Sequence, residues 1–339
     1  MKVKISSLLI TGMATLFLLS IALNGSAGDS TFLKTPGKVY GKIFSNFHTQ
    51  IGNSNNATAF EIKRAYFGYE KKLSKHFEAN VKLDIGSPED LSPYSLIRRY
   101  AYFKNAYLKY SNKKLITYFG IVDILHFKMQ EKYWAHRYIE KSFADKYRFG
   151  ITADLAWQVI YDWADWISTD FTLMNGEGYT KLQADNTLKA GAGVSIFPLK
   201  NFVTRIYYDL SAKSIIESTL AAFIGYKIEN KVIGGVEYNY KFNEDYKENY
   251  DRFGFSAYLS YYVLKKLQIF GRFDKVLSNK LGNEDNLWNL ARDGSKIIAG
   301  IEYSPIKNVK VALDYQDWFP YAENEPNSQF IYLDVKVSF

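Results

Sequence analysis

The sequence predicts an all-β fold, a transmembrane antiparallel β-barrel of about 16 strands with short periplasmic turns and long outer loops. Three observations favour this fold over a helical one. Apolar and polar residues alternate along many segments, short and long links alternate between those segments, and aromatic residues (24 Phe, 28 Tyr and 6 Trp among 339 residues) are abundant. A barrel is expected to carry such residues at its two membrane interfaces.

The first 27 residues differ from the rest of the chain. Lys2 and Lys4 precede an uncharged run over residues 5–22, and the small residues Ser26 and Ala27 follow shortly afterwards. A basic start, an apolar core and small residues in this order are typical of a secretory signal peptide. We therefore predict a signal peptide over residues 1–27 and one barrel domain over residues 28–339. A membrane anchor is the alternative, which the short apolar core disfavours.

Alternation of apolar and polar residues identifies the strands, because successive side chains of a strand point to opposite faces. In the last segment Ile331, Leu333 and Val335 lie on one face, while Asp334 and Lys336 lie on the other. No comparable stretch of the mature chain follows a helical period. The sixteen predicted strands begin near Val39, Ala59, His76, Tyr100, Leu115, Phe149, Asp165, Thr187, Phe202, Ser218, Val232, Asp251, Leu267, Ser295, Val309 and Gln329.

The lengths of the links separate a membrane barrel from a soluble sandwich. Links after even-numbered strands are short, such as residues 73–75 and 229–231, whereas those after odd-numbered strands are longer, up to residues 123–148. A barrel in the outer membrane has tight periplasmic turns and long outer loops, and a sandwich has no reason to keep this rhythm. The even strand count lets the last strand pair with the first, which leaves no open edge in hydrocarbon.

Several segments resemble a known family. Residues 60–69, leading through residues 73–75 into residues 77–84, resemble the second and third strands of outer-membrane porins of the phosphate-selective porin O and P type. Residues 127–143 and 175–179 are similar to relatives in that group.

This resemblance implies a passive, trimeric channel in the outer membrane of a Gram-negative bacterium. Its expected partners are small hydrophilic solutes or ions, outer-membrane lipid and the barrel-assembly machinery. The terminal Phe339 matches the aromatic end that such barrels present to that machinery. No nucleic acid partner is predicted.

The longest link, residues 123–148, is the candidate constriction loop, because the third outer loop of porins folds inward. A barrel this wide leaves a lumen open to water unless something narrows it. The charged residues that we predict to line the constriction are Lys128, Glu131, Lys132, Arg137, Glu140, Lys141, Lys146 and Arg148. Together with Asp123 and Asp145 they leave a cationic excess, which predicts a mild anion preference. The alternative is that these charges form solvated ion pairs on an outer surface.

The barrel wall gives a weaker prediction. Alternation places Arg64, Lys82, Arg205 and Arg272 on the lumen-facing side. The other lumen-facing charges are the cations Lys109, Lys189, Lys241, Lys296, Lys310 and Lys336 and the anions Glu70, Glu78, Asp84, Asp154, Asp170, Asp209, Glu237, Asp274, Glu302, Asp314 and Asp334. Both signs are evenly represented, so the wall lacks the one-sided row of arginines that suits oxyanions. The wall therefore does not predict phosphate specificity.

Catalysis is not predicted. The chain has four histidines, His48, His76, His126 and His136, and none lies in a recognised catalytic signature. Because it has no cysteine and the histidines are far apart, we predict no metal site and no cofactor. The chain is thus expected not to be an enzyme. The alternative function is a barrel with a plugged lumen that acts as a specific solute-binding protein or an enzyme.

Overall fold

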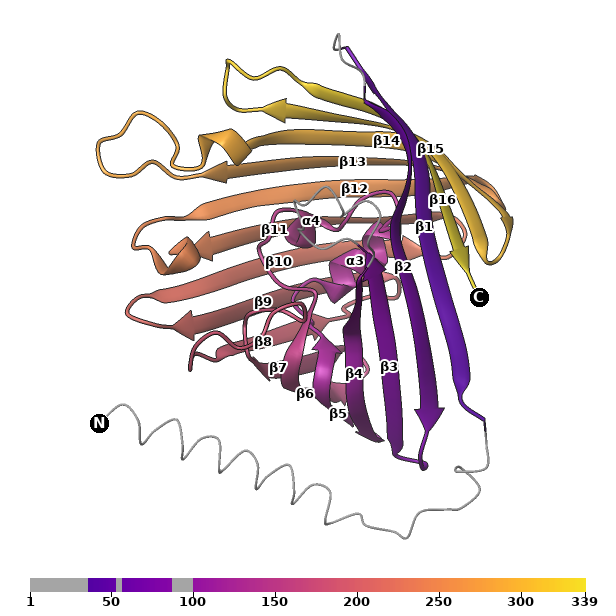
Figure 1. The fold of residues 1–339 in the computed structure, drawn as a ribbon. Helices are drawn as coiled ribbons and strands as arrows, with labels where there is room; N and C mark the ends of the chain where they lie inside the picture. Colours follow the sequence, from indigo (N-terminus) through magenta and orange to yellow (C-terminus); the bar gives the residue numbers. More distant parts are fainter. Residues whose placement is uncertain (1–35, 53–56, 87–99) are drawn as a thin grey trace.

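The computed structural model describes residues 36–52, 57–86 and 100–339, and sixteen strands within them form one closed barrel (Figure 1). Each strand pairs antiparallel with its sequence neighbours, and β1 pairs with β16. The predicted barrel is therefore confirmed, while the predicted signal peptide, residues 1–27, lies outside the described residues. The strands are β1 (Lys38–Ile51), β2 (Thr58–Lys72), β3 (Phe77–Gly86), β4 (Tyr100–Asn112), β5 (Leu115–Asp123), β6 (Ala153–Ala164), β7 (Ile167–Met174), β8 (Lys189–Ile196), β9 (Phe202–Ala212), β10 (Ile216–Ile228), β11 (Val232–Phe242), β12 (Arg252–Leu264), β13 (Leu267–Ser278), β14 (Gly294–Ile306), β15 (Val309–Pro320) and β16 (Ser328–Ser338).

One predicted strand start is wrong by more than two residues. The sixth strand begins at Ala153 instead of near Phe149. Phe149 belongs to the preceding link, where it is completely buried and stacks on Phe143 at a ring separation of 5.4 Å. The barrel closes as predicted, since the Gly41 N–H donates to the Phe339 carbonyl at 2.8 Å and the Phe339 N–H donates back at 3.1 Å.

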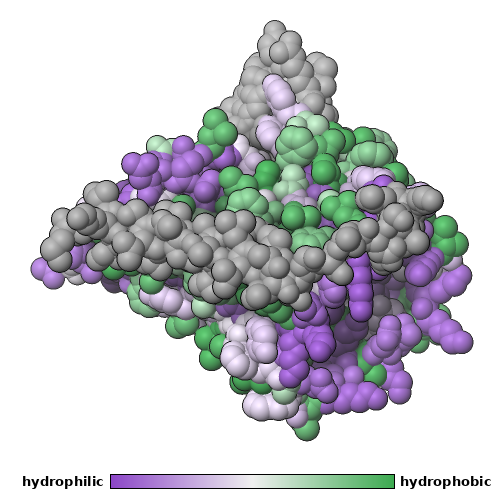
Figure 2. Space-filling model, turned by 90° about the horizontal axis from the view of Figure 1, so that it is seen from below, coloured by the Kyte–Doolittle hydropathy of each residue, from purple (hydrophilic) through white to green (hydrophobic). Residues whose placement is uncertain are grey.

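The two faces of the wall differ as alternation predicts. On β13 the Ile269 side chain is exposed outside, whereas Gln268 and Arg272 are buried inside. On β16 Leu333 is exposed and Asp334 is buried. In the view of Figure 2, hydrophobic residues form patches on the visible face, and hydrophilic residues gather around a hollow at the lower right. An apolar exterior on a closed barrel, whose strands pair all around, is what a hydrocarbon environment requires.

Two of the register irregularities in the described strands, both β-bulges, turn a lysine inward, while three others lie beside short turns. Lys63 is the extra residue of β2 opposite positions 44 and 45 of β1. Lys104 is the extra residue of β4 opposite positions 82 and 83 of β3. A bulge shifts the facing of the chain by one residue, so that both Lys104 and the next residue, Asn105, are buried inside the barrel. Each bulge therefore adds an inward lysine to the wall.

The link between β5 and β6, residues 124–152, contains two short helices and is called here the 124–152 loop. The helices are α3 (Lys128–Trp134) and α4 (Phe143–Lys146), and the 3-10 turns η1 (Glu244–Tyr246) and η2 (Leu290–Arg292) lie in other long links. In Figure 1 both α-helices lie within the curve of the strands. None of the helices in the described ranges is long and apolar enough to cross a membrane.

Candidate functional site

The 124–152 loop is packed inside the barrel. Phe127, Trp134 and Phe143 are buried. The Trp134 ring meets the inward-facing rings of Tyr258 and Phe270 edge-on, at centroid distances of 5.7 and 6.3 Å. Burying a side chain such as Phe127 contributes roughly 1.5–3 kcal/mol, so several of them fix the loop in one position against the wall.

Inward-facing donors of the wall bind the backbone of this loop. Arg205 of β9 donates to the Leu125 carbonyl at 3.1 Å, and Arg272 of β13 donates to the Lys141 carbonyl at 2.6 Å. An irregular buried backbone needs such partners, because its carbonyls have no ladder to pair with. The further donors are Thr219 to Phe149, Tyr258 to Gln130, Arg252 to Tyr147 and Lys63 to Ile139. Because most of these contacts come from β9–β14, we call that part of the barrel the anchoring wall.

His136 of the loop lies between two strands of the anchoring wall. Its Nδ1 donates to Glu302 Oε2 at 3.0 Å, and its Nε2 accepts from the Ser260 hydroxyl at 2.9 Å. Burial lowers the pKa of His136. The order carboxylate, imidazole and hydroxyl matches that of a hydrolytic triad, but all three side chains are buried. The cluster therefore acts as an anchor, since the Ser260 hydroxyl is closed to a substrate.

His126 is a second buried anchor. Its Nε2 donates to Asn239 Oδ1 at 2.9 Å, and its ring stacks on Tyr207 at 4.7 Å. Burial lowers the pKa of His126 to about 4, although the Asp209 carboxylate 3.9 Å from Nδ1 opposes the shift. Gly150 lies so close that an added Cβ would stand 2.3 Å from Nδ1, so only glycine fits beside this ring.

Three of the predicted constriction residues form ion pairs along the loop. Glu131 lies 3.6 Å from Lys128 and 3.2 Å from Arg137. Lys128 also pairs with Asp123 at 3.0 Å, and Arg137 pairs with Asp145 at 2.9 Å. Burial would lower the pKa of Lys128, but the Asp123 and Glu131 carboxylates outweigh it and raise that pKa. These charges largely compensate one another.

The other predicted residues of the loop differ in exposure. Glu140 pairs with Lys146 at 3.0 Å and with Lys296 of β14. Burial would raise its pKa, but the two lysines hold the pKa of Glu140 well below its usual range. The exposed predicted cations are Lys132, Lys141, Lys146 and Arg148. Among the described residues no carboxylate lies within ion-pair distance of Lys141, so its charge is not neutralised by a direct partner.

The four predicted wall residues fall on two sides of the barrel. Arg64 of β2 keeps a quarter of its side chain exposed and lies 3.3 Å from Asp84 of β3. Lys82 of β3 is also partly exposed. Arg205 and Arg272 point inward, but both are buried beneath the loop. We call β2–β4 the open wall, because Arg64 and Lys82 keep contact with solvent there.

A cavity of about 1000 Å³ lies between the 124–152 loop and the long outer links. Its lining includes Arg64 and Tyr102 of the open wall, Lys141 and Arg148 of the loop, and Tyr179 of the link between β7 and β8. A cavity of this size with charged walls can hold water and small polar solutes.

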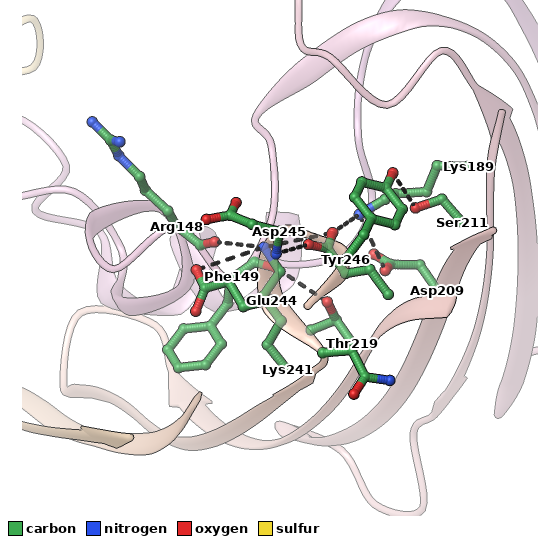
Figure 3. A network of polar contacts seen from close by, with 12 residues as sticks. Arg148, Phe149, Lys189, Asp209, Ser211, Thr219, Lys241, Glu244, Asp245 and Tyr246 are labelled. Carbon is green, nitrogen blue, oxygen red and sulfur yellow. Dashed lines mark hydrogen bonds and ion pairs between the residues drawn. The ribbon is translucent and has the colours of Figure 1, made fainter. Parts of the chain in front are cut away.

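The opposite rim of the cavity carries a paired network (Figure 3). Lys189 lies 3.2 Å from Glu217 and 3.7 Å from Asp209, and Lys241 lies 3.7 Å from Glu217. Lys241 also donates to the Arg148 carbonyl at 3.5 Å, which joins the end of the loop to the wall. Lysines and carboxylates offset each other here, so this rim differs from the side that bears Lys141.

Sequence reasoning missed Lys63 and Lys104, because strict alternation puts both on the outer face. In the structure Lys63 donates to the Ile139 carbonyl at 2.6 Å, and Lys104 donates to the Thr152 hydroxyl. Two polar residues in succession within an otherwise alternating strand, as at Lys63 and Arg64, were the available signal for a bulge.

Comparison with known proteins supports the fold. No family model matches the chain, and no curated protein matches it in sequence. The outer membrane channel DcaP of Acinetobacter baumannii is similar with a TM-score of 0.69 and 12% identity, covering 93% of this chain and 100% of that one. OmpF of Salmonella typhi, in complex with daunomycin, has a TM-score of 0.64 and 14% identity over 89% and 97%.

A trimer form of OmpT, an outer membrane protein of Vibrio cholerae, is similar with a TM-score of 0.58 and 12% identity over 90% of this chain and 100% of that one. Likeness at these identities shows the fold alone. The chain thus has the closed barrel fold of outer-membrane porins and channels, and the narrower resemblance to phosphate-selective porins stays a prediction.

Proposed function

We propose that the protein is an outer-membrane porin of a Gram-negative bacterium, through which small hydrophilic solutes or ions diffuse passively. The barrel has an apolar outer face and a charged inner face, which suits a water-filled passage through lipid. The observation that carries the proposal is the cavity of about 1000 Å³, with charged lining residues, between the wall and the 124–152 loop. The loop acts as the constriction.

The passage prefers anions mildly. Lys141, Lys146 and Arg148 are exposed and line the cavity, and of these Lys146 is paired with Glu140. The loop carboxylates Glu140 and Asp145 lie in ion pairs. Fixed exposed cations in a narrow aqueous passage attract anions and repel cations. Phosphate specificity is not part of this proposal, because the wall carries both signs.

Planar bilayers test the channel and its charge together. We expect stepwise, ohmic conductance from the purified protein, and a reversal potential of anion-preferring sign under a salt gradient. Lys141→Glu should shift that potential toward cations, since the charge on the cavity wall is inverted. The control Lys231→Glu makes the same change at an exposed short turn and should shift it less. Electrically silent insertion of the wild type would contradict the channel, and an unshifted Lys141→Glu variant would contradict the charge assignment.

A plugged, enzymatic barrel is less well supported. Within the described residues, the arrangement that resembles a catalytic triad, His136 between Glu302 and Ser260, is buried beneath the loop. We therefore propose a channel without catalysis and without a cofactor.

We further propose that residues 1–27 direct export and that Phe339 is read by the barrel-assembly machinery. The trimer form of the similar OmpT barrel supports a homotrimer in outer-membrane lipid. Chemical cross-linking in native membranes should give a ladder that ends at three copies.

A further inference from the structure

We propose that Tyr179, from the link between β7 and β8, is a second constriction residue that narrows the passage together with the 124–152 loop. This inference rests on the proposed channel function and adds a specificity-determining residue to it. Tyr179 lines the same cavity as Arg64 and Lys141. It thus belongs to the side of the passage where cations are exposed.

The backbone of the link turns inward before Tyr179. Gly176 and Gly178 have φ values of 100° and 88°, in the region that favours glycine. The Gly176 N–H donates to Asp154 Oδ2 at 2.5 Å, and the Tyr179 N–H donates to the Ala153 carbonyl at 3.0 Å. Both acceptors belong to the start of β6. The link is therefore tied to the strand that leaves the 124–152 loop.

The side chain of Tyr179 crosses from β6 to the open wall. Its hydroxyl donates to Asp84 Oδ2 of β3 at 2.7 Å. The Lys104 ammonium lies 4.1 Å from the centre of its ring, a distance at which a cation is attracted by the ring. Lys104 also donates to Thr152, the last residue of the 124–152 loop. The bulge that turns Lys104 inward thus joins both inward-folded links at one point.

This arrangement also changes the charge that a solute meets. Asp84 accepts from the Tyr179 hydroxyl and pairs with Arg64 at 3.3 Å, and its side chain is almost completely buried. The carboxylate is thereby covered by a phenol ring and a guanidinium. Arg64, Lys141 and the Tyr179 ring remain on the cavity surface, which also carries carboxylates such as Glu177. Beside the covered Asp84, a solute therefore meets the Arg64 guanidinium and an aromatic ring. Removing the ring should widen the passage.

Single-channel recording of Tyr179 variants tests the inference. Tyr179→Phe loses the bond to Asp84 but keeps the ring, so we expect more frequent current fluctuations with little change in mean conductance. Tyr179→Cys removes the ring and should raise conductance about twofold, since the narrowest section of a pore dominates its resistance. The chain has no cysteine of its own, so a sulfonate-bearing thiol reagent then reacts only at position 179 and should reduce the current again.

Tyr240 provides the matched control. Its hydroxyl also donates to an aspartate, Asp251, at 2.9 Å, but it lies on the face of β11 opposite the inward-facing Asn239, where its ring stacks on Phe253. Tyr240→Phe and Tyr240→Cys should leave conductance and its response to the thiol reagent unchanged. Equal conductance in the wild type and Tyr179→Cys, or a current insensitive to the reagent, would overturn the inference. A wild type that never conducts would instead overturn the channel itself.

Discussion

The anchoring wall and the open wall hold the same loop in different ways. On the anchoring wall the contacts are buried: Arg272 and Glu302 are at most 3% exposed, and they bind the loop at Lys141 and His136. On the open wall the contact from Lys63 to the loop backbone is made by a side chain that is 28% exposed. Lys104, which binds Thr152 at the end of the loop, is the buried exception on the open wall. Apart from that contact, one side of the loop is fixed in a dry interface, and the other borders water at Lys63.

This difference separates two roles for one residue type. Arg272 donates hydrogen bonds of 2.8 and 2.7 Å to Asp274 and a third to the backbone of the loop. Its charge is therefore neutralised within the interface. Arg64 pairs with Asp84 but keeps part of its surface in the cavity. In the proposed channel we therefore expect only inward-facing arginines that keep exposed surface, such as Arg64, to contribute to ion selectivity.

The largest expected effect comes from removing Glu302, which should weaken the attachment of the 124–152 loop to the anchoring wall. Its carboxylate accepts from His136 at 3.0 Å, Tyr138 at 2.7 Å and Lys310 at 2.6 Å. Breaking a buried charge pair by deleting one partner typically costs roughly 3–5 kcal/mol. We therefore expect Glu302→Ala to lower the free energy of unfolding by this amount, measured by urea titration in lipid vesicles.

The control for this variant is Glu229→Ala, in the exposed turn between β10 and β11. Glu229→Ala should have the same unfolding midpoint as the wild-type protein. The loop of a folded Glu302→Ala barrel should also move, which would appear as added noise in single-channel currents. Wild-type stability and quiet currents in Glu302→Ala would show that the anchoring wall does not depend on this carboxylate.

Low pH should lower the free energy of unfolding through His126, which also binds the anchoring wall. Its pKa falls from 6.5 to about 4 on folding, so the unfolded chain binds a proton more readily than the folded one. The stabilisation is complete above pH 6.5 and is lost as the pH falls toward 4. At about 1.36 kcal/mol per pKa unit, the loss reaches about 3 kcal/mol. His126→Gln, which cannot titrate, should show a smaller fall in unfolding free energy between pH 7 and pH 4. An identical fall in both proteins would exclude His126 as the cause.

The fold could be predicted from the sequence because period-two alternation and the rhythm of the links follow directly from closure in lipid. Fifteen of the sixteen strand starts were placed within two residues of those observed. The start of β6 failed because Phe149 is apolar in either setting, and only its packing on Phe143 shows that it belongs to the loop. Alternation of apolar and polar residues does not reveal such packing within a link.

The candidate site was only partly predictable. The 124–152 loop was found by its length, but alternation could not tell the buried Arg272 from the exposed Arg64, since both face inward. It also put Lys63 and Lys104 outside, because a single extra residue reverses every later facing. Tyr179 was missed as well, since its contact with Asp84 joins residues 95 positions apart.

The smallest expected effect concerns Glu140, where the two sides of the loop meet. This carboxylate binds Lys146, which is 39% exposed at the cavity, and Lys296, which is buried on the anchoring wall. Exposed ion pairs contribute about 0–1 kcal/mol, and Glu140 keeps its buried partner when Lys146 is lost. We therefore expect Lys146→Ala to change the free energy of unfolding by less than about 1 kcal/mol, while Lys296→Ala lowers it clearly more in the same urea titration. Equal losses in the two variants would mean that exposure does not set the strength of these contacts, and the distinction between the two walls would fail with it.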